Sequence, residues 1–94
     1  MLRIALALFC LTLLANCVGV GGRHTTVQRA GPDELLKLRA GPGLHYKVLL
    51  GLPDGTDLVR RDCVTEAGQL WCRVSLAKAP SVTGYVSADY LSDN

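Results

Sequence analysis

Five short runs of β-type residues, each bounded by turn-forming residues, constrain the fold of this chain more than any other feature of its sequence. The runs are ELLKL at 34–38, KVLLGL at 47–52, DLVRRDC at 57–63, LWCRVSL at 70–76 and GYVS at 84–87. Each is too short for a typical helix, and the segments between them contain Gly, Pro, Asp or Ser. The pattern predicts an all-β fold, a small antiparallel barrel or sandwich of about five strands.

Two places allow helical structure. The segment PDELLKL at 32–38 could begin a helix, because a proline and acidic residues stand at its start. A single helical turn is expected near SADYL at 87–91. Helices elsewhere are not expected.

The amino terminus has the pattern of an export signal. Arg3 is followed by an apolar run from Ile4 to Ala15, and then by small residues and the Gly-rich VGVGG. The run is shorter than the roughly 20 residues of a spanning helix, which disfavours a permanent transmembrane anchor. We predict a signal peptide over 1–19, a flexible tether over 20–34 and one folded domain over 35–94, in a periplasmic or secreted protein.

The way in which the signal is processed stays open. The segment LLANC at 13–17 resembles the lipobox of bacterial lipoproteins, in which the cysteine is lipidated. That motif has a small residue before the cysteine, whereas Asn16 stands there in this chain. Lipidation of Cys17 would give a membrane-anchored lipoprotein, and plain cleavage between Cys17 and Gly22 would give a free domain.

Export leaves two cysteines in the folded domain, Cys63 and Cys72. In an oxidising compartment such a lone pair is expected to form a disulfide. A zinc site takes four ligands from closely spaced pairs, and a redox site is usually a CxxC, so no metal and no cofactor is predicted. If VTEAGQ at 64–69 is a hairpin loop, the two cysteines face each other on adjoining strands and their bond fixes the register.

The charge of the chain disfavours nucleic acid as a partner. The sequence has 10 basic and 8 acidic residues and no basic stripe. Arg60 and Arg61 form only a modest cluster beside Asp62, which is typical of a solvated strand end. Arg60 also interrupts the alternation of DLVRRDC, so a bulge or an edge position is expected there.

Taken in order, three segments resemble the bacterial SH3 domain, the exported relative of the eukaryotic SH3 fold. They are LKLRAGPGLHYKVLLGLPDGTDL at 36–58, LWCRVSL at 70–76 and GYVSADYLS at 84–92. The residues that fit the family pattern are Leu38, Arg39, Gly41, Pro42, Gly43, Tyr46, Gly55, Thr56, Trp71, Val74, Gly84, Tyr85, Val86, Tyr90 and Leu91. A subset of the family also has both cysteines. The chain departs from the pattern at Arg60, where an apolar residue is usual, and at Tyr85, where Trp is commoner.

The resemblance implies an SH3-like barrel that acts as a binding module. Its ligand would be cell wall peptidoglycan, the stem peptides of the wall, or another envelope protein. The expected binding surface is the RAGPGLHY loop at 39–46 with nearby aromatics. The expected ligand-binding residues are Arg39, His45, Tyr46, Trp71, Tyr85 and Tyr90. For Trp71, Tyr85 and Tyr90 a purely structural role, covering the hairpin or completing a small core, has equal weight.

No catalytic constellation is visible in the sequence, and the protein is predicted not to be an enzyme. Serine hydrolysis needs a serine, a base and an orienting acid, and His45 is the only histidine within 35–94. A cysteine nucleophile would have to be a free thiolate, which a disulfide prevents. The alternative function is a structural or inhibitory envelope protein that acts through a single protein partner, with membrane contact only through a lipid anchor.

Overall fold

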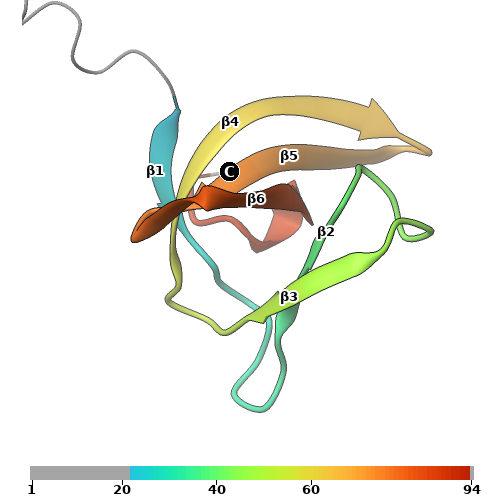
Figure 1. Ribbon diagram of the computed structural model, residues 1–94. Coiled ribbons are helices and arrows are strands. Elements are labelled where there is room, and N and C mark those ends of the chain that lie inside the picture. The colour runs from blue at the N-terminus through green and yellow to red at the C-terminus, as the bar shows by residue number, and fades with distance from the viewer. Residues whose placement is uncertain (1–21, 94) are drawn as a thin grey trace, which may run out of the picture.

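The structure of the protein is a computed structural model that describes residues 22–93. It contains six strands and one 3-10 turn, namely β1 (Arg23–Thr26), β2 (Leu36–Arg39), β3 (Val48–Leu52), β4 (Asp57–Glu66), β5 (Gln69–Leu76), β6 (Ala79–Ser87) and η1 (Ala88–Tyr90). The strands form one antiparallel sheet in the order β1-β4-β5-β6-β2-β3 (Figure 1). The predicted all-β fold and the turn near residue 88 are confirmed, with six strands where about five were expected. Residues 36–39, where a helix was the alternative, are a strand.

The first strand corrects the prediction of a flexible tether over 20–34. Arg23–Thr26 pairs antiparallel with β4, and Val27 after it is 2% exposed and forms a bridge with Leu91. RHTT has no apolar alternation of its own, so this strand depends on partners far along the chain. The predicted signal peptide over 1–19 and Cys17 lie outside the described residues.

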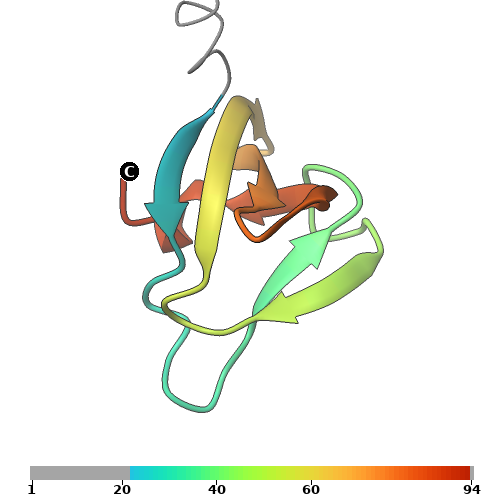
Figure 2. The same cartoon turned by 60° about the vertical axis from the view of Figure 1, so that its left-hand side comes forward.

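The core lies between the long strands β4, β5 and β6 and the β2–β3 hairpin, which crosses below them (Figures 1 and 2). Its most deeply buried apolar residues, all 0% exposed, are Leu38, Leu58, Cys72, Val74, Val86 and Leu91. β2 joins β6 through the single register pair Arg39–Tyr85. At this junction a side chain on Gly84 would lie 2.7 Å from the Arg39 carbonyl oxygen, so the close approach requires glycine.

The predicted disulfide between Cys63 and Cys72 is present. The two residues are directly opposite each other in β4 and β5, with their Cα atoms 4.0 Å apart. Ala67 and Gly68 close the hairpin with positive φ angles of 51° and 80°, as a two-residue hairpin turn with a right-handed strand twist requires. β4 contains one residue more than β5 between Arg60 and the disulfide, so the bulge expected at Arg60 is confirmed.

Candidate functional site

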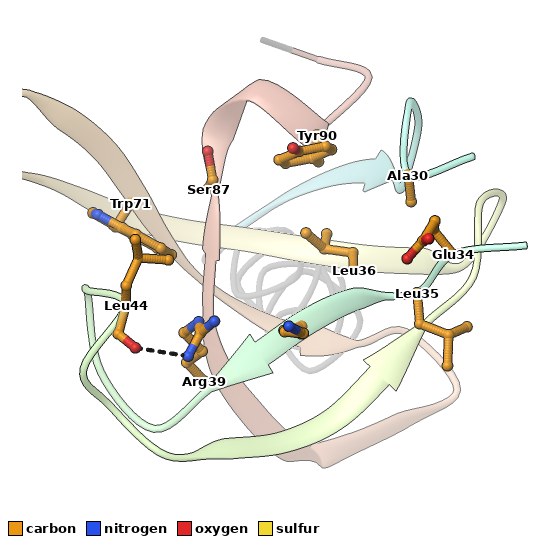
Figure 3. A pocket seen from close by; sticks show the side chains of 10 residues that line it. Ala30, Glu34, Leu35, Leu36, Arg39, Leu44, Trp71, Ser87 and Tyr90 are labelled. Carbon is orange, nitrogen blue, oxygen red and sulfur yellow. Dashed lines mark hydrogen bonds between the residues drawn. The ribbon is translucent and has the colours of Figure 1, made fainter.

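Two adjoining hollows form one groove, which we call the aromatic groove, beside the loop between β2 and β3. They have volumes of about 280 and 490 Å³ and share four lining residues, Leu44, Trp71, Ser87 and Tyr90. The first hollow, drawn in Figure 3, is also lined by Ala30, Glu34, Leu35, Leu36, Lys37 and Arg39. The second is also lined by Pro42, Gly43, His45, Glu66, Ala67, Gln69 and Asp89. The larger volume lies in the range of ligand pockets, about 300–1,000 Å³, and the smaller lies just below it.

The floor and wall of the aromatic groove are apolar. Trp71 of β5 is 6% exposed, so only part of its indole faces the groove. Tyr90 of η1 is half-buried and packs against the core. Leu44, at 76% exposed, lies at the rim and close to Trp71 (Figure 3). A bound group would therefore contact the exposed part of the Trp71 indole, the Tyr90 ring and the Leu44 side chain. Because Leu44 is largely exposed, binding would remove its apolar surface from water.

Arg39 holds the loop that forms one side of the groove. Its Nη1 donates to the carbonyl oxygens of Leu44 at 3.0 Å and Tyr46 at 3.1 Å. The loop is closed further by the Ala40 amide, which donates to the Lys47 carbonyl at 2.8 Å. Since a guanidinium has five N–H groups and the loop engages Nη1 alone, Arg39 keeps donors for an acidic ligand group.

Four of the six predicted ligand-binding residues line the aromatic groove. Arg39 lines the first hollow, His45 the second, and Trp71 and Tyr90 both. The structure thus brings together residues from β2, the 40–47 loop, β5 and η1.

The other two, Tyr46 and Tyr85, line neither hollow. The Tyr46 ring stacks on His45, with centroids 4.3 Å apart and an interplanar angle of 34°. It also covers Gly41, where a Cβ would lie 2.5 Å from the ring. Tyr85 stands between Arg39 of β2 and Arg73 of β5, its direct neighbours across the sheet. Neither tyrosine therefore contributes to the lining of the aromatic groove.

Sequence reasoning missed the polar residues at the hairpin end of the groove. Glu66 and Gln69 come from the β4–β5 hairpin tip, and Asp89 comes from η1. Gln69 Nε2 donates to Ser87 Oγ at 2.7 Å and to Asp89 Oδ2 at 3.4 Å, which ties the tip to η1. No local pattern marks these residues, because only the long hairpin carries its tip to the groove. The groove consequently has the carboxylates of Glu66 and Asp89 at this end, whereas the other hollow has the cations of Arg39 and Lys37 together with the carboxylate of Glu34.

The groove offers apolar, cationic and acidic side chains for contact with a ligand. Ser87 Oγ accepts hydrogen bonds from Gln69 and from the Asp89 amide, so its hydroxyl serves the start of η1. Within residues 22–93, no three His, Cys, Asp or Glu side chains are grouped so that they could hold a metal ion. The same part of the chain contains no helix of the length and apolarity that crossing a membrane demands.

Comparison with known proteins adds no relative. No protein-family model matches this chain, and neither a curated protein nor a solved structure does.

Proposed function

We propose that the protein is a non-catalytic binding module of the cell envelope, exported by the signal peptide predicted over 1–19. The observation that carries the proposal is the aromatic groove, in which Trp71 and Tyr90 supply apolar contact area between Arg39 and the carboxylates of Glu66 and Asp89. The proposed ligand is peptidoglycan, through its stem peptides. Such peptides present carboxylates that Arg39 could bind and amines that Glu66 and Asp89 could bind.

We also propose that the sheet is an SH3-like barrel. The short connection at 53–56 supports closure, because it joins β3, one edge of the sheet, to β4, which lies next to the other edge strand, β1. The segment after β1 also hydrogen-bonds to this connection, in continuation of the β1–β4 pairing. The Val27 amide donates to the Thr56 carbonyl at 3.1 Å, and the Gly55 amide donates to the Val27 carbonyl at 2.8 Å. The order of the motifs that resemble bacterial SH3 domains supports the same assignment.

A periplasmic or secreted location is part of the proposal. The Cys63–Cys72 bond is compatible with an oxidising compartment, where disulfides form and persist. Lipidation of Cys17 would keep the same domain at the membrane surface.

One observation favours the second candidate function, a structural or inhibitory protein that acts through one protein partner. β3 is an edge strand of the sheet, and its residues Val48, Leu49 and Leu50 are 42%, 47% and 42% exposed. An apolar edge strand with unpaired backbone groups can accept a strand from another protein. This surface is separate from the aromatic groove.

The two functions can be separated with a matched pair of variants. Leu44→Asp changes the rim of the groove, and Leu49→Asp makes the same change on β3; both side chains are exposed, so the fold should be kept. Wild-type protein should be retained by purified peptidoglycan sacculi. Leu44→Asp should bind them at least about tenfold more weakly, as expected for a contact residue, and Leu49→Asp should bind like wild type.

If wild-type protein is not retained by sacculi, peptidoglycan binding is wrong. Capture of one envelope protein that is lost with Leu49→Asp and kept with Leu44→Asp would then support the partner function. Far-UV circular dichroism and an intact disulfide would serve as controls for folding of each variant.

A further inference from the structure

Four arginines on three neighbouring strands line a hollow outside the aromatic groove, which we call the arginine hollow. Arg23 comes from β1, Arg60 and Arg61 from β4, and Arg73 from β5. The hollow has a volume of about 420 Å³, and its other lining residues are Gly22 and Asp62. None of these residues lines the aromatic groove.

The fold brings these charges together against their mutual repulsion. Arg23 is the direct partner of Arg60 in the β1–β4 register, and like charges in that position destabilise a sheet. The bulge before Cys63 adds Arg61 and Asp62 at the same place. In the sequence only Arg60 and Arg61 are adjacent, so the cluster becomes visible through strand pairing alone.

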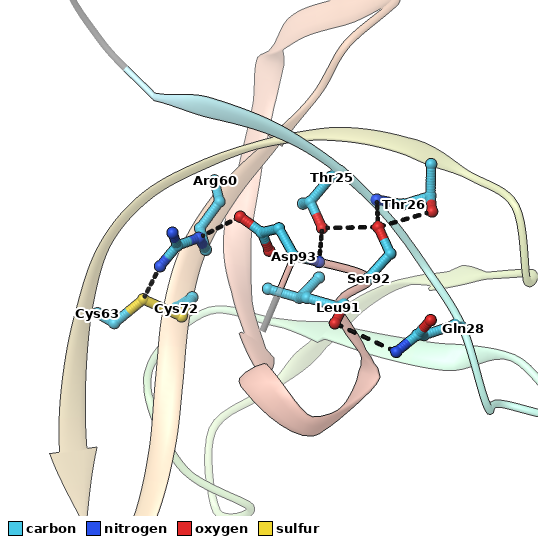
Figure 4. A network of polar contacts seen from close by, with 9 residues as sticks. All are labelled: Thr25, Thr26, Gln28, Arg60, Cys63, Cys72, Leu91, Ser92 and Asp93. Carbon is cyan, nitrogen blue, oxygen red and sulfur yellow. Dashed lines mark hydrogen bonds and ion pairs between the residues drawn. A yellow bond between two sulfur atoms is a disulfide. The ribbon is translucent and has the colours of Figure 1, made fainter.

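Two carboxylates offset part of this charge. Arg60 Nε donates to Asp93 Oδ2 at 2.9 Å (Figure 4), and Arg73 Nε donates to Asp62 Oδ1 at 3.0 Å. The hydrogen bond from Arg73 holds the pKa of Asp62 below its ordinary value, so this exposed carboxylate is ionised at neutral pH.

The remaining two arginines have no carboxylate partner within residues 22–93. Arg61 Nη2 reaches the buried Ser75 hydroxyl at 3.4 Å, and Arg23 is exposed at the start of β1. The hollow therefore keeps an excess of positive charge and free guanidinium donors. Guanidinium groups match phosphate oxygens in geometry as well as in charge.

The position of the hollow in the chain indicates which kind of phosphate-bearing molecule it would meet. Gly22 lines the hollow, and in the sequence it follows the apolar run Ile4–Ala15 of the predicted signal peptide. Four residues lie between Cys17 and Gly22, and the five residue steps span at most about 17 Å when fully extended. An amino-terminal attachment to a bilayer would hold the hollow within reach of the lipid headgroups.

We propose that the arginine hollow binds the phosphate groups of anionic membrane lipids and seats the domain on the membrane surface by its β1 end. This binding is independent of the wall-binding function proposed for the aromatic groove. An anionic surface attracts each nearby arginine, and the attraction falls with distance and with salt.

The test is binding to lipid vesicles by the purified protein, in the processed form that cells yield. Vesicles of phosphatidylcholine alone are compared with vesicles that contain about 30% phosphatidylglycerol, at about 0.05 M and 0.5 M salt. We expect a preference for the anionic vesicles that high salt removes. Arg23→Gln with Arg61→Gln should reduce that binding by on the order of tenfold or more and leave binding to neutral vesicles unchanged.

The matched control is Lys47→Gln with Lys78→Gln, which removes the same charge from two exposed lysines outside the hollow. An equal loss in both double variants would show attraction by net charge and overturn the proposal, as would the absence of any preference for anionic vesicles.

Binding of inorganic phosphate to the protein is measured as a further experiment. Saturable phosphate binding that needs Arg23 and Arg61, without vesicle binding, would assign the hollow to a soluble phosphate compound and overturn the membrane assignment.

Discussion

Arg60 connects β4, the disulfide and the carboxyl-terminal segment through one guanidinium. Its Nε donates to Asp93 Oδ2 at 2.9 Å and its Nη1 lies 3.5 Å from Cys63 Sγ (Figure 4). The two side chains of the ion pair are 25% and 16% exposed, so solvent screens them less than an ordinary surface pair. The bulge beside Arg60 and the carboxylate opposite explain how a cation occupies a position where the family resemblance implied an apolar residue.

Replacing Arg60 should therefore destabilise the fold. Arg60→Ala leaves the Asp93 carboxylate without its cation, and Asp93 Oδ1 is already buried with no hydrogen-bond partner in the described part of the chain. We expect a loss of about 1–3 kcal/mol in the free energy of unfolding, measured with urea. In the double variant with Asp93→Ala the cost should be smaller than the sum of the two single costs. Strict additivity would contradict the pairing.

The β4–β5 hairpin is the longest strand pair of the sheet, and it runs from the core to the aromatic groove. The disulfide lies between the bulge and the hairpin tip, and the tip carries Glu66 and Gln69 to the aromatic groove. A bond between strands close in sequence constrains the unfolded chain through a short closed loop. On the loop-entropy model a loop of about ten residues is worth roughly 2.7 kcal/mol.

Reduction of Cys63–Cys72 should lower stability by about that amount. For a domain of this size we expect the melting temperature to fall by on the order of 10 °C, measured by circular dichroism with and without a reductant. The Cys63→Ala, Cys72→Ala double variant should melt like the reduced protein and be insensitive to reductant. An unchanged melting temperature on verified reduction would be the contrary result.

The strands that sequence patterns predicted well are those with a run of β-type residues bounded by turn residues, such as β3 and β5. Within LWCRVSL, alternation predicts Leu70, Cys72, Val74 and Leu76 on one apolar face, with Trp71 on the other. Cys72 and Val74 are 0% exposed, but Leu70 is 39% exposed because it lies at the hairpin tip, beyond the core. Trp71, on the opposite face, is 6% exposed beside Leu44 in the groove. Alternation alone could not predict the burial of Trp71, since the loop that carries Leu44 comes from a distant segment of the chain.

At the scale of the whole molecule, the two ends of the described chain are fastened together. Ser92 Oγ accepts from the Thr26 amide at 2.9 Å and from the Thr26 hydroxyl at 3.0 Å, while the Ser92 amide donates to the Thr26 carbonyl at 2.9 Å. The carboxyl-terminal end lies beside β1 in Figure 2. This contact explains why a polar segment expected to be a tether is an ordered strand, and why local sequence gave no sign of it.

Ser92→Ala should loosen β1 more than the rest of the sheet. Losing the hydroxyl removes the side-chain bonds to Thr26, for a cost of about 1 kcal/mol, so we expect the amide hydrogens of β1 to exchange roughly fivefold faster. Amide exchange followed by NMR would measure this, with Ser81→Ala at an exposed position of β6 as the matched control. Faster exchange spread evenly over all strands would speak against a local role for Ser92.

The contact between β1 and residues 91–93 also has a consequence for biosynthesis. Ribosomes deliver a chain from its amino end, so β1 emerges early while Ser92 is still to be translated. The fastening cannot form until residues 91–93 have cleared the exit tunnel. A nascent chain that has not yet delivered residues 91–93 would therefore leave β1 without its hydrogen bonds to Ser92.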